Sequence, residues 1–295
     1  MLRETLELFK DTVSNWNKDH APRLGAALAY YTVFSLGPLL IIVIAIAGLV
    51  FGAEAAQGQI VGQMQGLVGE QGAAFIQAAI ESASQPRSSV IASVIGIVTL
   101  LLGALGVFAQ LQDALNTIWD VTPKPDRGWR GLIEDRLLSF SMILVVGFLL
   151  LVSLVASTAL AAFFKYVGGV VPMTAIMAEG VNFFVSFAVI TLLFALIFKY
   201  LPDAQIAWSY VWIGAAMTAL LFTIGKVILG IYLGNSAVSS AYGAAGSLVV
   251  VLVWVYYSAQ ILFFGAEFTK VYANRYGAGI IPAPNAVRVT EEIGV

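Results

Sequence analysis

The chain has no cysteine, a single histidine, His20, and few charges, since only 11% of its 295 residues are Asp, Glu, Lys or Arg. Without cysteine it can form no disulfide, no thiolate nucleophile and no cysteine metal site. One histidine is too few for a zinc site built from several imidazoles. These absences exclude disulfide-stabilised proteins, thiol-dependent enzymes and His-ligated zinc proteins.

Long apolar runs are what the chain has instead, and 60% of its residues are hydrophobic. Each run can cross a hydrocarbon layer about 30 Å thick as a helix. A helix also satisfies its own backbone hydrogen bonds in lipid, which an isolated strand cannot do. We therefore expect an all-α integral membrane protein, a six-transmembrane-helix bundle over residues 26–51, 89–111, 137–164, 176–198, 207–233 and 247–268.

The Lys and Arg residues outside these runs are distributed unevenly. Twelve lie in the segments on one side of the predicted bundle, whereas only Arg87 and Lys165 lie on the other side. Cytoplasmic segments of membrane proteins carry the excess of positive charge. The sequence therefore predicts that both termini lie in the cytoplasm.

The remaining segments have patterns of their own. Residues 1–24 predict an amphipathic helix that lies in the cytoplasmic interface or packs on the cytoplasmic face of the bundle. Residues 25–272 form the transmembrane domain, and its loop 53–88 predicts two short amphipathic helices that fold over the outer surface as a periplasmic lid, with a break near 69–72. Residues 273–295 contain few large apolar side chains and predict a disordered cytoplasmic tail.

Lys226 is the one Lys well inside an apolar run. A charge at the centre of a membrane helix costs about 2.5–3.5 kcal/mol, so such residues are candidates for function. At 1.5 Å per residue it lies about 10 Å below the outer end of its helix. Either it contacts an anionic substrate or lipid headgroup in a cavity, or its long stem snorkels to the outer interface.

The last apolar run carries three further candidates. Glu267 lies near the cytoplasmic end, where it contacts substrate or sits in the headgroup region. Gln260, near the middle, forms an interhelical hydrogen bond or contacts substrate. Tyr256 is favoured as a packing residue, and substrate contact is its alternative.

A polar strip is expected at the cytoplasmic end of the first two runs. Gln110, Asp113 and Asn116 are spaced by three and share one helical face. Arg23 enters the first run at the same depth, and Tyr30 continues the strip away from it. An Arg23–Asp113 contact explains this pattern structurally, and a polar vestibule open to the cytoplasm explains it functionally.

Small residues at the outer ends of the fifth and sixth runs predict a tight helical hairpin. Gly230 and Gly234 have the G-x-x-x-G spacing, and Gly243 and Gly246 stand at the start of the sixth run. This spacing lets two membrane helices approach closely.

Several blocks of the sequence form a recognisable pattern: AALAYY at 26–31 with Ser35 and Pro38, LNTIW at 115–119, Tyr232, SSAYGAAG at 239–246, WVYY at 254–257 and GAE at 265–267. In these blocks the chain resembles the YihY/BrkB family of bacterial inner-membrane proteins. The resemblance covers residues 5–275 and implies six transmembrane helices with both ends inside and an inner-membrane location. Family members have been labelled virulence factors or a tRNA-processing ribonuclease, and a role in moving lipids or lipid-linked precursors is suspected.

The residues argue against the ribonuclease label, because a nuclease needs a metal or acid–base cluster and a basic surface. We expect a non-enzymatic transporter or flippase-like protein for a lipid, lipid-linked or other anionic amphipathic substrate. The alternative is a structural scaffold of an envelope complex. We expect no metal, cofactor or nucleotide, since no G-x-x-x-x-G-K-[ST] motif occurs. The expected partners are membrane lipids and a second copy of the chain, without nucleic acid.

Overall fold

The structure analysed is a computed structural model. It describes residues 2–84, 90–125, 136–149, 174–235 and 245–289, with Gly128, Gly131 and Glu134 as isolated positions. Some of the predicted features lie outside the described residues. They are residues 85–88 of the lid with Arg87, residues 150–165 with the end of the third apolar run and Lys165, residues 236–244 with Gly243, and residues 290–295.

Helices make up most of the described chain, and four short strands lie between or after them. The helices are α1 (Leu2–Lys18), α2 (Ala21–Phe51), α3 (Ala53–Ser84), α4 (Val90–Ile118), α6 (Thr174–Tyr200), α7 (Trp208–Asn235) and α9 (Gly246–Tyr276). A shorter apolar helix covers Arg136–Leu149. The strands are β1 (Val121–Pro123), β2 (Ala204–Gln205), β3 (Ile281–Pro282) and β4 (Ala286–Arg288).

Four described helical stretches are long and apolar enough to cross a membrane. They are Ala21–Gly48, Gly180–Tyr200, Trp208–Ile231 and Gly246–Tyr276. All six predicted runs are helical wherever the structure describes them. The prediction of an all-α membrane protein is therefore confirmed, and the total of six crossings stays a prediction.

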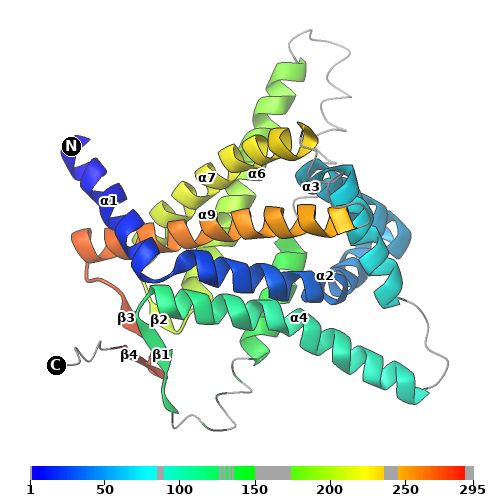
Figure 1. Cartoon of the computed structure of the whole chain (residues 1–295), viewed down its shortest axis with the longest axis horizontal. Helices are drawn as coiled ribbons and strands as arrows, with labels where there is room; N and C mark the ends of the chain where they lie inside the picture. Colours follow the sequence, from blue (N-terminus) through cyan, green and yellow to red (C-terminus); the bar gives the residue numbers. More distant parts are fainter. Residues whose placement is uncertain are drawn as a thin grey trace.

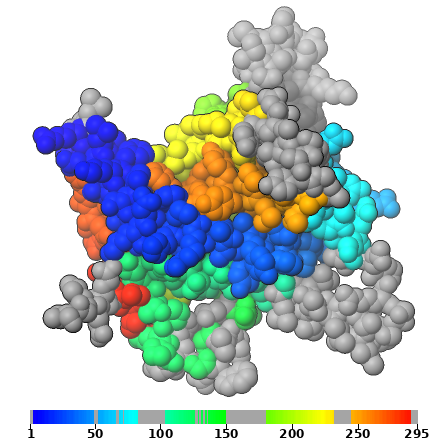
Figure 2. Space-filling model, viewed as in Figure 1, coloured from blue at the N-terminus to red at the C-terminus, as the bar shows by residue number. Residues whose placement is uncertain are grey.

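Helix α9 lies between α2 and α7 and contacts both. The space-filling view shows these three helices side by side across one face (Figure 2). Helix α1, the end of α9 and the four strands lie at one end of the bundle, and α3 lies at the other (Figure 1). We call the first the charged end and the second the opposite end.

The contact between α7 and α9 depends on two glycines, each facing a threonine of the other helix. A methyl group on Gly214 would clash with Thr269, and one on Gly265 would clash with Thr218. Each threonine hydroxyl donates to its own helix, Thr218 to Gly214 O and Thr269 to Gly265 O, both at 2.7 Å. The two helices of the predicted hairpin thus pack closely at Gly214 and Gly265. No atom of the described residues lies within 4 Å of a Cβ placed on Gly230, and since Gly243 lies outside those residues, close contact at the outer end stays a prediction.

Helix α1 packs against α9 through aromatic rings. The ring centroid of Phe9 lies 6.3 Å from that of Phe264 and 5.9 Å from that of Phe268. Leu6 and Val13 stay exposed at 69% and 47%. Of the two interpretations of this helix, packing on the bundle is therefore observed, and its uncovered apolar side chains remain available to lipid.

Helix α3 has the predicted break. Gly69 adopts φ 74° and ψ 177°, a non-helical conformation that glycine tolerates. Apolar side chains from both of its halves, Ile60 and Ile76, join one buried cluster with Val43 of α2. The predicted lid is therefore packed on protein at the opposite end.

The prediction of a disordered tail is wrong for residues 273–289. Helix α9 continues to Tyr276, and then β3 pairs with β2 while β4 pairs with β1, both antiparallel. Ile280 and Ala286 are buried at 3% and 5%. The tail is ordered because its backbone groups find partners and its few apolar side chains enter the core.

A proline also stands at the junction between α1 and α2, but it does not break the helix there. Pro22 stands in the first turn of α2, where its missing N–H costs nothing. The break falls instead at His20, whose φ of 52° is left-handed. This turn sets the position of the neighbouring Asp19.

Candidate functional site

A polar cavity of about 560 Å³ lies at the charged end, and we call it the vestibule. Its wall is formed by the α1–α2 junction, α4, β1, the start of helix Arg136–Leu149 and the turn between α6 and α7. The charged residues in the wall are Lys18, Arg23, Arg136, Asp19, Asp113, Asp120 and Asp203. A cavity of this size can hold the polar head of an amphipathic molecule.

Asp203, in the α6–α7 turn, is held by amide side chains from two distant segments. Its Oδ2 accepts from Asn116 Nδ2 at 2.8 Å and from Gln112 Nε2 at 3.2 Å, and its Oδ1 accepts from Asn285 Nδ2 at 3.2 Å. The Asp203 N–H donates to Asn116 Oδ1 at 2.8 Å. These bonds join α4, the α6–α7 turn and the C-terminal segment around one buried carboxylate.

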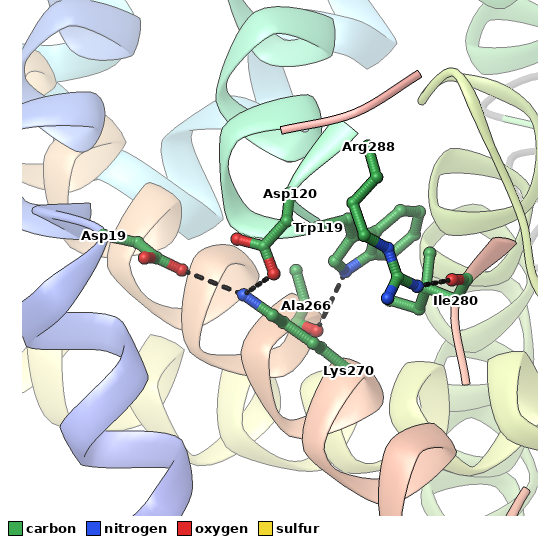
Figure 3. A network of polar contacts seen from close by, with 7 residues as sticks. All are labelled: Asp19, Trp119, Asp120, Ala266, Lys270, Ile280 and Arg288. Atoms are coloured by element: carbon green, nitrogen blue, oxygen red, sulfur yellow. Dashed lines mark hydrogen bonds and ion pairs between the residues drawn. The ribbon is translucent and has the colours of Figure 1, made fainter. Parts of the chain in front are cut away.

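Lys270 of α9 joins two other parts of the charged end. Its Nζ lies 3.2 Å from Asp19 Oδ2 and 2.9 Å from Asp120 Oδ2 (Figure 3). The side chains of Lys270 and Asp19 are only 10% and 12% exposed. We call this set of three residues the clamp, because it ties α9 to the α1–α2 junction and to the end of α4.

The left-handed backbone of His20 and Asp120 and the buried indole of Trp119 position the clamp. Asp120 has a φ of 54°, which Asp tolerates better than bulky residues do. The preceding Trp119 is 2% exposed, and its Nε1 donates to Ala266 O at 3.1 Å (Figure 3). The end of α4 is thereby fixed against α9 one turn before Lys270.

Glu267 lies beside the clamp and is fully buried, with 0% of its surface exposed. Neither of its carboxyl oxygens has a hydrogen-bond partner among the described residues. The charged groups that interact with it are Lys270, Asp19 and Asp120. Burying an ionised carboxylate without a hydrogen bond is expensive, so this residue is the least satisfied polar group of the site.

A second cavity, of about 360 Å³, lies on the other side of the clamp and is lined by Asp120, Lys270 and Arg288, among others. Arg288 of β4 donates from Nη2 to Ile280 O at 2.7 Å (Figure 3). Asp120 borders both cavities, whereas Asp19 borders the vestibule and Lys270 the second cavity. The clamp therefore lies between the two cavities.

Three charged side chains in the wall of the vestibule have no partner within the described residues. Within the described part of the chain, no hydrogen bond or ion pair engages the side chains of Arg23, Arg136 and Asp113. Arginine presents several donors in a planar fork that suits phosphate and carboxylate groups. The vestibule thus offers two free guanidinium groups and one free carboxylate to a ligand.

The structure brings part of the predicted polar strip together. Arg23, Asp113 and Asn116 all line the vestibule, as the functional interpretation required. A direct Arg23–Asp113 ion pair is absent from the described residues. Gln110 does not line the cavity, and Gln112, one turn before Asn116, takes the place predicted for it.

Lys226 and Gln260 lie elsewhere. The hollow beside Lys226 is walled mainly by apolar and aromatic side chains and has no room for a water molecule, so the wetted cavity considered for it is not observed. Gln260 packs against Gly25 of α2, and its amide atoms have no hydrogen-bond partner among the described residues. The predicted interhelical hydrogen bond of Gln260 is therefore wrong, and Lys226, Gln260 and Arg23 do not share one cavity.

Tyr30 and Tyr256 lie on the outside of the bundle, 59% and 38% exposed. The ring of Tyr30 contacts the rings of Tyr31 and Phe34, with centroids 5.8 Å and 4.8 Å away. Neither tyrosine borders the vestibule. Their positions suit contact with lipid chains better than contact with a polar headgroup.

The sequence analysis missed five charged residues of the site, namely Asp19, Asp120, Arg136, Asp203 and Lys270. Each lies at or beyond the end of an apolar run, where a charge costs little free energy and does not by itself indicate a function. The sequence did contain a signal that could have identified them. Polar residues flank almost every apolar run on the side predicted to be cytoplasmic, and together they indicate a polar region there. No group of three or more His, Asp or Glu side chains in the described part is placed to hold a metal ion.

The fold and the site together define an all-α integral membrane protein with a polar vestibule at one end of its bundle. Its family is shown by sequence: the family described as Virulence factor BrkB matches residues 12–290, and the chain belongs to it. The resemblance to the YihY/BrkB family is thereby confirmed.

Similar curated proteins carry the name UPF0761 membrane protein. That of Verminephrobacter eiseniae is 28% identical over 85% of this chain and 58% of its own length. That of Teredinibacter turnerae is 27% identical over 91% of this chain and 61% of its own length, and that of Tolumonas auensis is 28% identical over 85% and 80%. The chain thus spans less than two thirds of the first two relatives. No solved structure matches it significantly.

Proposed function

We propose that this protein is a non-enzymatic carrier of the inner membrane, which moves a lipid or other amphipathic molecule with an anionic headgroup. In this proposal the chain crosses the membrane six times, and the charged end faces the cytoplasm. The observation that carries it is the vestibule, a polar cavity of about 560 Å³ at that end with two unengaged guanidinium groups.

The distribution of basic residues supports this orientation. Twelve of the fifteen Lys and Arg residues lie in segments that the prediction places on one side. Among the described ones, Arg23, Lys124, Lys270 and Arg288 all stand at the charged end, next to the vestibule or to β1 and β4. Positive charge is retained on the cytoplasmic side.

Recognition would depend on Arg23 and Arg136. A phosphate or carboxylate headgroup would accept charge-assisted hydrogen bonds from both guanidinium groups. Asp113 stands in the same wall and would pair with an ammonium group if the headgroup has one. The acyl chains would remain in lipid, beside exposed aromatic residues such as Tyr30.

Among the described residues, the opposite end of the bundle is packed rather than open. The hollow beside Lys226 holds no water, and α3 packs on α2 through a buried apolar cluster. A cavity open at one end and packed at the other is the arrangement of a carrier that faces one side. Since the sequence has no nucleotide-binding motif, movement would be passive or coupled to an ion.

A vesicle assay tests this function. The purified full-length chain is reconstituted with a fluorescent anionic phospholipid, and an impermeant quencher reports transfer between leaflets. We expect faster transfer than in protein-free vesicles, and about tenfold slower transfer for Arg23→Gln, which corresponds to the loss of about 1.4 kcal/mol of binding.

Arg3→Gln is the matched control, because Arg3 is 95% exposed on α1 and does not line the vestibule. It should transfer lipid as the wild type does. Wild-type vesicles that show no acceleration would contradict the carrier function and leave the architectural role of an envelope scaffold. Equal loss in both arginine variants would contradict the role of the vestibule.

A further inference from the structure

Glu267 is a fully buried carboxyl group to which no N–H group or hydroxyl of the described residues donates, and it lies beside the carboxyl group of Asp19. It stands one helical turn from Lys270, which already contacts Asp19 and Asp120. We propose that Glu267 is the binding site of one exchangeable proton, and that this proton decides whether Lys270 stays in the clamp. The proposal deepens the carrier function, for which the proton would be the coupling ion. The binding of the proton itself does not depend on that function.

The charges around Glu267 come from three elements. Asp19 follows α1, Asp120 follows α4, and Lys270 lies on α9 itself. His20, beside Asp19, is exposed in the vestibule wall. Two aspartates already outnumber the single lysine, so an ionised Glu267 would add a third negative charge in a buried place.

Three neutral donors on this part of α9 and on its neighbours are committed to other acceptors. Thr218 of α7 donates its hydroxyl to Gly214 O, and Thr269 donates to Gly265 O. The indole N–H of Trp119 donates to Ala266 O. Nothing in this set stabilises a buried carboxylate, and an uncompensated buried charge is costly.

A proton fits the site better than a metal ion does. Metal cations such as Ca²⁺ need about six or more oxygen ligands, and Mg²⁺ needs an octahedral set. The described residues contain no group of three or more acidic or histidine side chains placed to hold a metal. A single proton on one Glu267 oxygen neutralises that carboxylate without any further ligand.

Release of the proton would change the partner of Lys270. The proton leaves Glu267 for the water of the adjoining cavities, and a carboxylate remains. Lys270 is three residues further along α9, on the same face, and is the nearest cation that can neutralise it. Its ammonium group would then leave Asp19 and Asp120, and the partition between the vestibule and the second cavity would open.

Infrared spectroscopy of the purified full-length protein in lipid nanodiscs tests the proposal. A protonated carboxyl group has a carbonyl stretching band that carboxylates and amides lack. We expect one such band at neutral pH, its complete loss in Glu267→Gln, and its retention in the control Glu54→Gln, because Glu54 is exposed on α3. Raising the pH should remove the wild-type band reversibly.

The possible results separate this proposal from the carrier function. A neutral-pH spectrum with no protonated carboxyl band, or a band that survives Glu267→Gln, overturns the proposal. If that variant fails to fold, titration of the wild-type protein with sodium at constant pH decides. A band that sodium displaces would show that the site binds sodium, and this would overturn the proposal of a proton site. No lipid substrate is needed, so a band of Glu267 alongside inactive vesicles would refute the carrier function alone.

Discussion

The two ends of the bundle treat the same residue type differently. Lys270, at the charged end, is 10% exposed and lies within 3.2 Å of two aspartates. Lys226, towards the opposite end of the neighbouring helix, faces Phe222, Trp254 and other side chains around a hollow too small for water. Both lysines lie on apolar helices, so the difference comes from the polar turns around Asp19 and Asp120, which the described residues place beside Lys270.

This comparison implies that the charged end is a built polar site and that the opposite end is packing. The charged end gathers segments far apart in the chain, with Asp203 bonded to Asn116 and Asn285. The opposite end gathers apolar side chains of α2 and α3. A membrane protein that needs only to span would require the second kind of region and not the first.

A matched pair of lysine substitutions is the strongest test of this contrast. Lys270→Met leaves Asp19 and Asp120 without their cation and should lower the free energy of unfolding by about 3 kcal/mol. Lys226→Met replaces a lysine among apolar neighbours and should change it by about 0.5 kcal/mol or less. Denaturant titration in detergent micelles measures both.

Equal losses in the two lysine variants would show that the opposite end also holds a stabilising charge. A loss confined to Lys226→Met would reverse the comparison.

The glycines of α7 and α9 provide a second matched pair, with a smaller expected effect. Gly265→Val pushes a side chain into Thr218 and should cost about 2 kcal/mol of stability. Gly230→Val meets no atom within 4 Å and should be close to neutral. Thermal unfolding of the detergent-solubilised protein distinguishes the two variants. A larger loss of stability for Gly230→Val would support the close contact first predicted at Gly230.

The C-terminal segment permits the mildest test. Asn285→Ala removes one hydrogen bond to Asp203 and should cost about 1 kcal/mol. Asn285→Asp places a second carboxylate against Asp203 and should cost more than the alanine variant. Limited proteolysis after residue 276 would report the release of this segment. Equal cleavage of the variants and the wild type would indicate that the segment is disordered, as the sequence suggested.

The membrane helices were predictable because each is a long apolar run, and α1 and α3 were predictable from their amphipathic patterns. The kink at Gly69 was predictable because glycine tolerates its backbone conformation. The short strands were not. β1 pairs with β4 across more than 160 residues, so neither strand carries a local signal of its own. The order of the tail depends on these distant partners, and composition alone suggested disorder.

The candidate site was only partly predictable for a related reason. Helical spacing placed Asp113 and Asn116 on a common face, and both do line the vestibule. Spacing cannot show that His20 and Asp120 turn the chain with φ of 52° and 54° and thereby bring Asp19 to Lys270. Lys226 attracted attention through its depth, whereas depth gives no information on whether space surrounds a side chain.

Thiol labelling of single-cysteine variants tests the central claim most directly, because the natural chain has no cysteine. Thr117→Cys places the thiol in the vestibule wall, and Ser258→Cys places it beside the hollow of Lys226. An impermeant reagent should label the Thr117→Cys variant from the cytoplasmic side only and leave the Ser258→Cys variant unlabelled from both sides. Labelling of Ser258→Cys from the outside, with Thr117→Cys protected from the cytoplasm, would contradict a site at the charged end.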